Sequence, residues 1–126
     1  MEEEKVHVAH DLGKFAEKRA AEEYIKKGYT VLERNWRLGK IEIDLIVQKD
    51  NVIVIVEVKA RSGKDKLPID SITHDKRRRM TRAGDAYLQK MKGDFDYRFD
   101  YFTLTGDMEN YKIEILEDAF LAADFF

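Results

Sequence analysis

The stretch Val52-Ile53-Val54-Ile55-Val56-Glu57-Val58-Lys59 decides the fold of this chain of 126 residues. Its β-branched residues predict a strand. The nearly continuous apolar run indicates that both faces of this strand are buried, so we expect it in the middle of a sheet. Side chains alternate along a strand, and Glu57 and Lys59 therefore share one face with Ile53 and Ile55. Charged side chains on a buried central strand need partners, and we expect those of Glu57 and Lys59 on the neighbouring strand.

That neighbouring strand is predicted from Ile41 to Gln48, and the pair Asp50-Asn51 that follows is typical of a tight turn. If the turn has two residues, the strands run antiparallel with Lys49 opposite Val52. Strict alternation then assigns each side chain to a face. We expect Ile41, Ile43, Leu45 and Val47 on one face, and Glu42, Asp44 and Ile46 on the other.

The same register brings two carboxylates together, because Asp44 falls opposite Glu57 with Cβ atoms about 5 Å apart. Two like charges placed in this way are destabilising unless something neutralises them. A divalent cation does so, and hard cations such as Mg²⁺ prefer carboxylate oxygens. The register also places Glu42 opposite Lys59. The charges are thus equally compatible with a simple ion pair between strands, and a slip of one residue would separate the two carboxylates.

Around this pair the sequence predicts two helices and three more strands. The first helix runs from His10 to Lys27, and Gly28 ends it. After a polar loop from Ser62 to Pro68, the second helix begins at about Ile69 or Ser71 and ends at Lys92. The remaining strands are expected from Tyr29 to Trp36, from Phe95 to Thr105 and from Tyr111 to Leu116, and the apolar tail from Ala119 to Phe126 is expected to pack back on the domain.

The predicted order of elements is α-β-β-β-α-β-β. The second helix forms a crossover, so the strands before and after it should be parallel, and the sheet should be mixed. The length of the chain fits one domain that spans residues 1–126. The fold class expected from the pattern is therefore α/β.

A third carboxylate, Glu17, lies on the first predicted helix. In a helical projection it falls inside the broad apolar arc that includes Ala16 and Ala20. Burying an unpaired carboxylate is expensive. Glu17 therefore either sits at the edge of the arc and pairs with solvent or with a basic neighbour, or it points at the cation site of Asp44 and Glu57.

Composition and charge limit the possible classes of protein. The chain has no cysteine, which excludes disulfides and thiolate metal sites, and its formal net charge is −2. No apolar run approaches the roughly 20 residues of a membrane helix, and the N-terminus lacks a signal-peptide pattern. We therefore expect a cytoplasmic protein without a membrane partner. The basic run Lys76-Arg77-Arg78-Arg79 is compatible with a solvated helix face and with contacts to a DNA backbone.

Three motifs in chain order resemble those of the YraN family of bacterial proteins. They are Gly13-x-x-Ala16-Glu17, Glu42-Ile43-Asp44-Leu45-Ile46 and Val56-Glu57-Val58-Lys59-x-Arg61, and the resemblance extends from Gly13 to Phe120. That family is similar to archaeal Holliday-junction resolvases and belongs with the PD-(D/E)xK nucleases. The resemblance implies a restriction-endonuclease-like fold with an α-β-β-β-α-β core.

The resemblance also implies a function and the residues that perform it. The expected activity is that of a Mg²⁺- or Mn²⁺-dependent DNA endonuclease, which hydrolyses phosphodiesters in branched DNA during repair or recombination and acts as a homodimer. Its metal carboxylates would be Asp44 and Glu57, with Lys59 as the catalytic lysine and Glu17 as a helix-borne acid. From their positive charge, and not from the resemblance, the candidates for contacts with phosphates are Arg61, Lys76, Arg77, Arg78 and Arg79.

Two other functions fit the same sequence. One is a nucleic-acid-binding module of the same fold without significant catalysis. The other is a protein-interaction adaptor, whose contact surface would be the acidic last third of the chain.

Overall fold

The computed structural model describes residues 2–63 and 73–119, with side chains described from residue 11 onward. The central strand of its single five-stranded sheet is β3 (Val52–Arg61). The strand order is β1-β2-β3-β4-β5, and β3 pairs in parallel with β4, while the other neighbours are antiparallel. The mixed sheet with a central β3 confirms the predicted fold class. The other strands are β1 (Thr30–Leu38), β2 (Ile41–Lys49), β4 (Asp96–Gly106) and β5 (Tyr111–Leu116).

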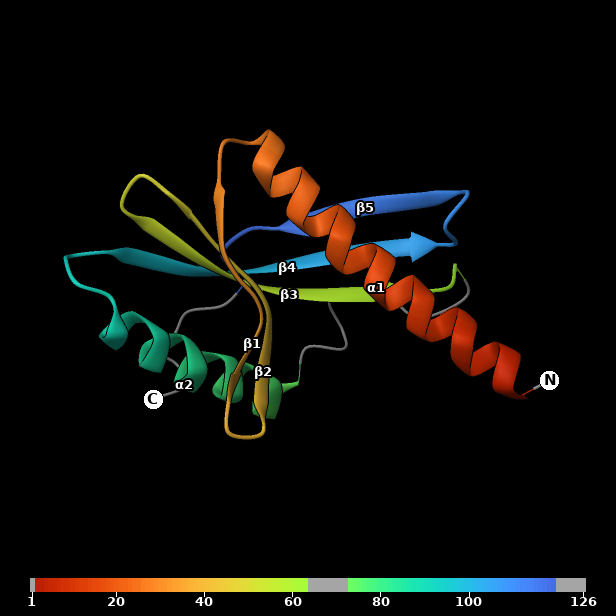
Figure 1. The fold of residues 1–126 in the computed structure, drawn as a ribbon, viewed down its shortest axis with the longest axis horizontal. Helices are drawn as coiled ribbons and strands as arrows, with labels where there is room; N and C mark the ends of the chain where they lie inside the picture. Colours follow the sequence, from red (N-terminus) through yellow and green to blue (C-terminus); the bar gives the residue numbers. More distant parts are fainter. Residues whose placement is uncertain (1, 64–72, 120–126) are drawn as a thin grey trace.

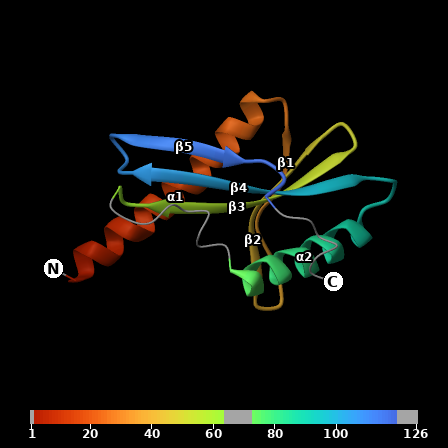
Figure 2. The same cartoon turned by 180° about the vertical axis from the view of Figure 1, so that it is seen from behind.

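The two helices cover opposite faces of the sheet, as Figures 1 and 2 show from front and back. Helix α1 (Glu2–Lys26) packs on one face, and α2 (His74–Lys90) packs on the other. Each face has its own apolar core, because the alternate side chains of β3 point to different helices. The α1 cluster contains Ala16, Ala20, Ala21, Tyr24, Val54, Val56 and Val58, and the α2 cluster contains Ile53, Ile55, Met80, Ala83, Tyr87 and Phe99.

The predicted register between β2 and β3 is confirmed over its first half. Lys49 lies opposite Val52, and the paired positions continue as far as Leu45 opposite Val56. Asp50 in the turn has a positive φ of 54°, a conformation that Asp tolerates better than most residues. The two-residue turn therefore sets the register, as the sequence predicted.

Helix boundaries differ from the predicted ones. Helix α1 begins at Glu2 rather than at His10, and α2 ends at Lys90 rather than at Lys92. The described helix α2 starts after its N-cap, Thr73, whose side chain accepts a hydrogen bond from the backbone N–H of Lys76. The predicted starts at Ile69 or Ser71, most of the loop to Pro68, and the tail beyond Ala119 lie outside the described residues. Ala119 itself packs against the α2 cluster.

Strand β2 bends at Asp44, and the predicted alternation of its side chains is wrong there. Leu45 belongs to the α1 cluster, whereas Ile43 packs in the α2 cluster together with Ile46. Across from the bend, Asn35 of β1 has a left-handed φ of 52°. Both strands change direction at this point, and the outer half of the β1–β2 hairpin turns away from β3 (Figure 1).

Because the hairpin turns away, the predicted opposition of Glu42 and Lys59 is not formed. The pairing of β2 with β3 ends at Leu45 and Val56, three residues short of Glu42 and Lys59. Glu42 instead lies opposite Arg37 of β1, with which it forms an ion pair of 3.2 Å. Among residues 2–63 and 73–119 no helix is long and apolar enough to span a membrane.

Candidate active site

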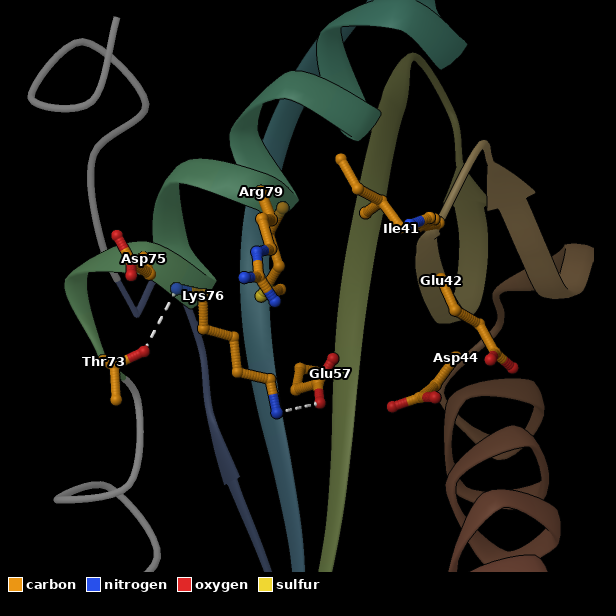
Figure 3. Close-up of a pocket in the computed structure, with 10 residues that line it drawn as sticks. Ile41, Glu42, Asp44, Glu57, Thr73, Asp75, Lys76 and Arg79 are labelled. Atoms are coloured by element: carbon orange, nitrogen blue, oxygen red, sulfur yellow. Dashed lines mark hydrogen bonds and ion pairs between the residues drawn. The ribbon is translucent and has the colours of Figure 1, made fainter.

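A hollow of about 530 Å³ lies where the hairpin separates from the sheet. Its walls come from the outer half of β2, from β3 and from the start of α2 (Figure 3). The bend at Asp44 creates this space, because a straight β2 would continue along β3 and fill it. The hollow is lined by Lys40, Ile41, Glu42, Asp44, Glu57, Thr73, Asp75, Lys76, Arg79 and Met80.

Asp44 lies at the bend itself and is held by the strand from which β2 departs. Its Oδ2 accepts a hydrogen bond of 2.9 Å from the backbone N–H of Val58. The pairing of β2 with β3 has ended at this point, and the carboxylate supplies the acceptor that the Val58 N–H would otherwise lack. Burial raises the pKa of Asp44, and the Val58 N–H and the charge of Lys76 partly offset that effect. The contact fixes the direction of the carboxylate toward the hollow.

Glu57 faces Asp44 across the base of the hollow (Figure 3). Its residue is 9% exposed, and its Oε1 lies 2.5 Å from the Nζ of Lys76. Burial, and then the negative charge of Asp44, raise the pKa of Glu57 to about 7, although Lys76 opposes the shift. A side-chain hydrogen bond with Asp44 raises the pKa of Glu57 further. The two carboxyl groups therefore need a proton or a cation between them.

Glu17 lies on the opposite side of Asp44, in a second hollow of about 150 Å³ that Asp44 also lines. Burial raises the pKa of Glu17, and the charges of Asp44 and Glu42 raise it further, while Lys14 opposes them. The charge of Asp44 thus acts on Glu17 from the first hollow to the second. In the described part of the chain no three acidic or histidine side chains converge closely enough to hold a metal ion, so the predicted trio does not meet directly.

Lys59 lies two residues beyond Glu57 on β3 and is half-buried. It is not among the described residues that line the hollow, and Lys76 from α2 takes the place beside Glu57. Sequence patterns do not indicate this pair, because the contact depends on how α2 docks on the sheet. The N-cap of α2 is Thr73, whose side chain accepts the backbone N–H of Lys76 and so holds Lys76 in the first turn of the helix.

The residues predicted to contact phosphates divide into two groups. Lys76 and Arg79 line the hollow, and Lys40 joins them from the turn between β1 and β2, where sequence reasoning did not single it out. The others lie outside the lining of the hollow: Arg61 and Arg77 are half-buried, and Arg78 is exposed.

Comparison with known proteins places these residues in a family. The sequence profile of the group described as Uncharacterised protein family UPF0102 matches residues 16–104. The chain belongs to the UPF0102 family. This confirms the resemblance to the YraN family, which is the same group. All the residues of the candidate site, from Glu17 to Arg79, lie inside the matched span of this UPF0102 protein.

Individual UPF0102 proteins match over most of their length. The chain is 43% identical to the UPF0102 protein of Flavobacterium psychrophilum over 112 residues, which are 88% of this chain and 94% of that one. The UPF0102 protein of Phocaeicola vulgatus is 39% identical over 88% of this chain and 93% of its own. A more distant relative from Chlorobium phaeobacteroides is 34% identical over 90% and 97%. These names state no activity, so the function has to be argued from the site.

Proposed function

We propose that this protein is a metal-dependent endonuclease that hydrolyses phosphodiester bonds in DNA. The observation that carries the proposal is the pair of half-buried Asp44 and buried Glu57 at the base of an open hollow whose lining also includes Lys40, Lys76 and Arg79. Two carboxylates in contact are costly to keep together without a positive partner. Perturbed carboxylates in a hollow are typical of a functional site.

The donor set of this pair suits a hard divalent cation. Both side chains offer oxygen ligands, which Mg²⁺ and Mn²⁺ prefer. Asp44 and Glu57 would hold the cation. Glu17 lies in the neighbouring hollow, near enough for its pKa to be raised by the charge of Asp44, and it would bind one of the cation's waters rather than the cation itself. A bound cation of this kind lowers the pKa of water and draws electron density from a phosphate group.

The remaining side chains supply the binding and the positioning that hydrolysis needs. Lys40 and Arg79 offer positive charge on two walls of the hollow, where they would attract phosphate oxygens. Lys59, on the same face of β3 as Glu57, would orient the attacking water or offset the charge that develops on phosphorus. Asp44 keeps its orientation through the Val58 N–H, so the attacking and leaving groups meet a fixed carboxylate.

Branched DNA is the substrate that the similarity to the resolvases suggests, and a cytoplasmic homodimer would present two such sites to one junction. A cleavage assay should therefore compare linear, flapped and four-way DNA with Mg²⁺ and with Mn²⁺. We expect wild-type protein to cut at least one of these, and Asp44→Asn to lose the activity.

Glu42→Gln is the matched control, since Glu42 is another acid of β2 that lines the same hollow but is exposed and paired with Arg37. It should keep most of the activity. If the protein binds DNA but cleaves none of the substrates, the proposal of an enzyme should be replaced by that of a nucleic-acid-binding module. If the protein neither binds nor cleaves DNA, the result would favour the protein-interaction adaptor.

A further inference from the structure

We propose that Lys76 is a built-in counter-ion of the site, which competes with the divalent cation for Glu57 and is displaced when the cation binds. This inference rests on the proposed function, because it concerns the cation expected there. It assigns to Lys76 a role in controlling when the site is loaded, in addition to the phosphate contact that the sequence predicted.

The contacts of Lys76 carry the first step. Its Nζ is 2.5 Å from the Oε1 of Glu57, and in Figure 3 the lysine side chain reaches down from α2 to that carboxylate. The Lys76 side chain is 35% exposed, whereas the Glu57 side chain is 11% exposed. Among the ion pairs of the described residues, this is the one that involves either Asp44 or Glu57. The acid is thus fixed in the interior, and its lysine partner approaches from the open side.

The second step follows from the space around one oxygen. Mg²⁺ binds carboxylate oxygens at about 2.1 Å and demands a nearly octahedral shell. An ammonium group in hydrogen-bond contact with Oε1 occupies the direction from which a cation would approach that atom. Glu57 cannot offer the same oxygen to both, so the two positive groups compete.

Charge balance indicates which of them prevails. Ionised Asp44 and Glu57 carry two negative charges, and Lys76 supplies one positive charge. A divalent cation neutralises both acids, and the ammonium group then has no net charge left to attract it. Binding of the cation should therefore release Lys76 from Glu57.

The released side chain has somewhere to go. The backbone of Lys76 is held by the Oγ1 of Thr73, which accepts the Lys76 N–H at 3.1 Å, so the start of α2 need not move. The four-carbon side chain is flexible, and it opens into a hollow of about 530 Å³. The ammonium group would thus stay in the hollow, where it can contact a phosphate group of the substrate.

The test is a calorimetric titration of the purified full-length protein with Mn²⁺. Lys76→Met keeps the length of the side chain and its helix propensity but removes the charge. We expect it to bind Mn²⁺ on the order of tenfold more tightly than wild type, because the cation no longer has to break a charged hydrogen bond. Lys76→Gln, a second neutral variant, should do the same, and Lys76→Arg should bind no more tightly than wild type.

Lys40→Met is the matched control, since it removes the same charge from the wall of the same hollow but not from Glu57. Its gain in Mn²⁺ affinity should be clearly smaller than that of Lys76→Met. Equal gains in the two variants would mean that only the general charge of the hollow matters, and would overturn the inference.

Asp44→Asn separates this inference from the proposed function. If Asp44→Asn weakens Mn²⁺ binding but neither neutral variant of Lys76 strengthens it, the metal site stands and the role of Lys76 is refuted. If Mn²⁺ binds to the Lys76 variants and not to wild type, the competition is confirmed. If no variant binds Mn²⁺ in a way that depends on Asp44, both proposals fail.

Discussion

Glu57 lies between two groups whose charges differ in sign: the carboxyl group of Asp44, which repels it, and the ammonium group of Lys76, which attracts it. At the residue scale, half of this arrangement follows from the sequence. The turn at Asp50-Asn51 fixes the register of two adjacent strands, and counting outward from it predicts that Asp44 faces Glu57. Lys76 could not be predicted in the same way, because its contact depends on the angle at which a helix packs.

The raised pKa of Glu57 makes the stability of the metal-free protein depend on pH. A carboxyl group that binds its proton more tightly in the folded state stabilises that state fully below its unfolded pKa, and this stabilisation is lost as the pH rises through the folded pKa. With a folded pKa of about 7, the free energy of unfolding should fall between about pH 4.5 and pH 7 by on the order of 3 kcal/mol. Thermal unfolding without metal should show this fall, and Glu57→Gln should lack it.

Asp44→Asn tests the repulsion between the two carboxylates directly. The amide oxygen can still accept the Val58 N–H, while the negative charge beside Glu57 disappears. The metal-free variant should therefore be as stable as wild type at pH 8, or more stable by about 1 kcal/mol, and it should lose the stabilisation by Mg²⁺ or Mn²⁺. A clear loss of stability without metal would instead assign Asp44 a structural role at the bend.

Lys59 and the exposed arginines of α2 should differ in what they contribute. Lys59→Ala should reduce cleavage on the order of 100-fold while it leaves most DNA affinity, because the lysine would act on the reacting phosphate. Replacing Arg78 and Arg79 with Met should weaken DNA binding and lower its salt dependence by about one unit of slope per lost phosphate contact. Lys92→Met, just beyond the far end of α2, is the control for lost charge. Equal effects of Lys59→Ala on binding and cleavage would contradict this division.

At the scale of the elements, the bend in the β1–β2 hairpin is the feature that sequence patterns missed. A rule of strict alternation holds only while a strand stays straight, and here Ile43 and Leu45 point to different cores. Nothing in the run Ile41 to Val47 marks the change, since every second residue is apolar on either side of it. The clue lies on the other strand, where Asn35 is one of the few residue types that adopts a positive φ readily.

Substitutions at Asn35 should therefore report on the bend. Asn35→Ala forces a residue with an unfavourable left-handed conformation and should cost about 1 kcal/mol of stability, whereas Asn35→Gly should cost less. Chemical denaturation measures both. Because the bend creates the hollow, Asn35→Ala should also lower Mn²⁺ affinity, and Asn35→Gly should retain it. Equal stability of the two variants would mean that the backbone there relaxes without strain.

At the scale of the whole molecule, a buried polar group joins the layers. Asp100 of β4 is 1% exposed, and it accepts hydrogen bonds from the Tyr24 hydroxyl of α1, from Arg98, and from the backbone N–H of Asp118 after β5. Arg98 in turn donates to the hydroxyl of Tyr29, next to β1. The sequence offered the residues of this network but no reason to connect them, because they are far apart along the chain.

Tyr24→Phe removes one bond of this network without opening a cavity. Because it leaves a buried carboxylate with one donor fewer, it should lower the free energy of unfolding by about 1–3 kcal/mol. Tyr97→Phe on β4, where the tyrosine is exposed, is the matched control and should change stability by less than about 0.5 kcal/mol. Similar losses in both variants would show that the Asp100 network does not hold the layers together.

The parallel pairing of β3 with β4 has a consequence for the order in which the molecule assembles. Its partners, such as Val52 and Asp96, are far apart in sequence, whereas β2 and β3 are joined by two residues. Contacts between close neighbours form early, and distant ones wait for a large loss of chain entropy. The hairpin should therefore bring Asp44 and Glu57 together before α2 delivers Lys76. We expect refolding to be faster at pH 5 than at pH 8, since protonation removes the repulsion during that interval.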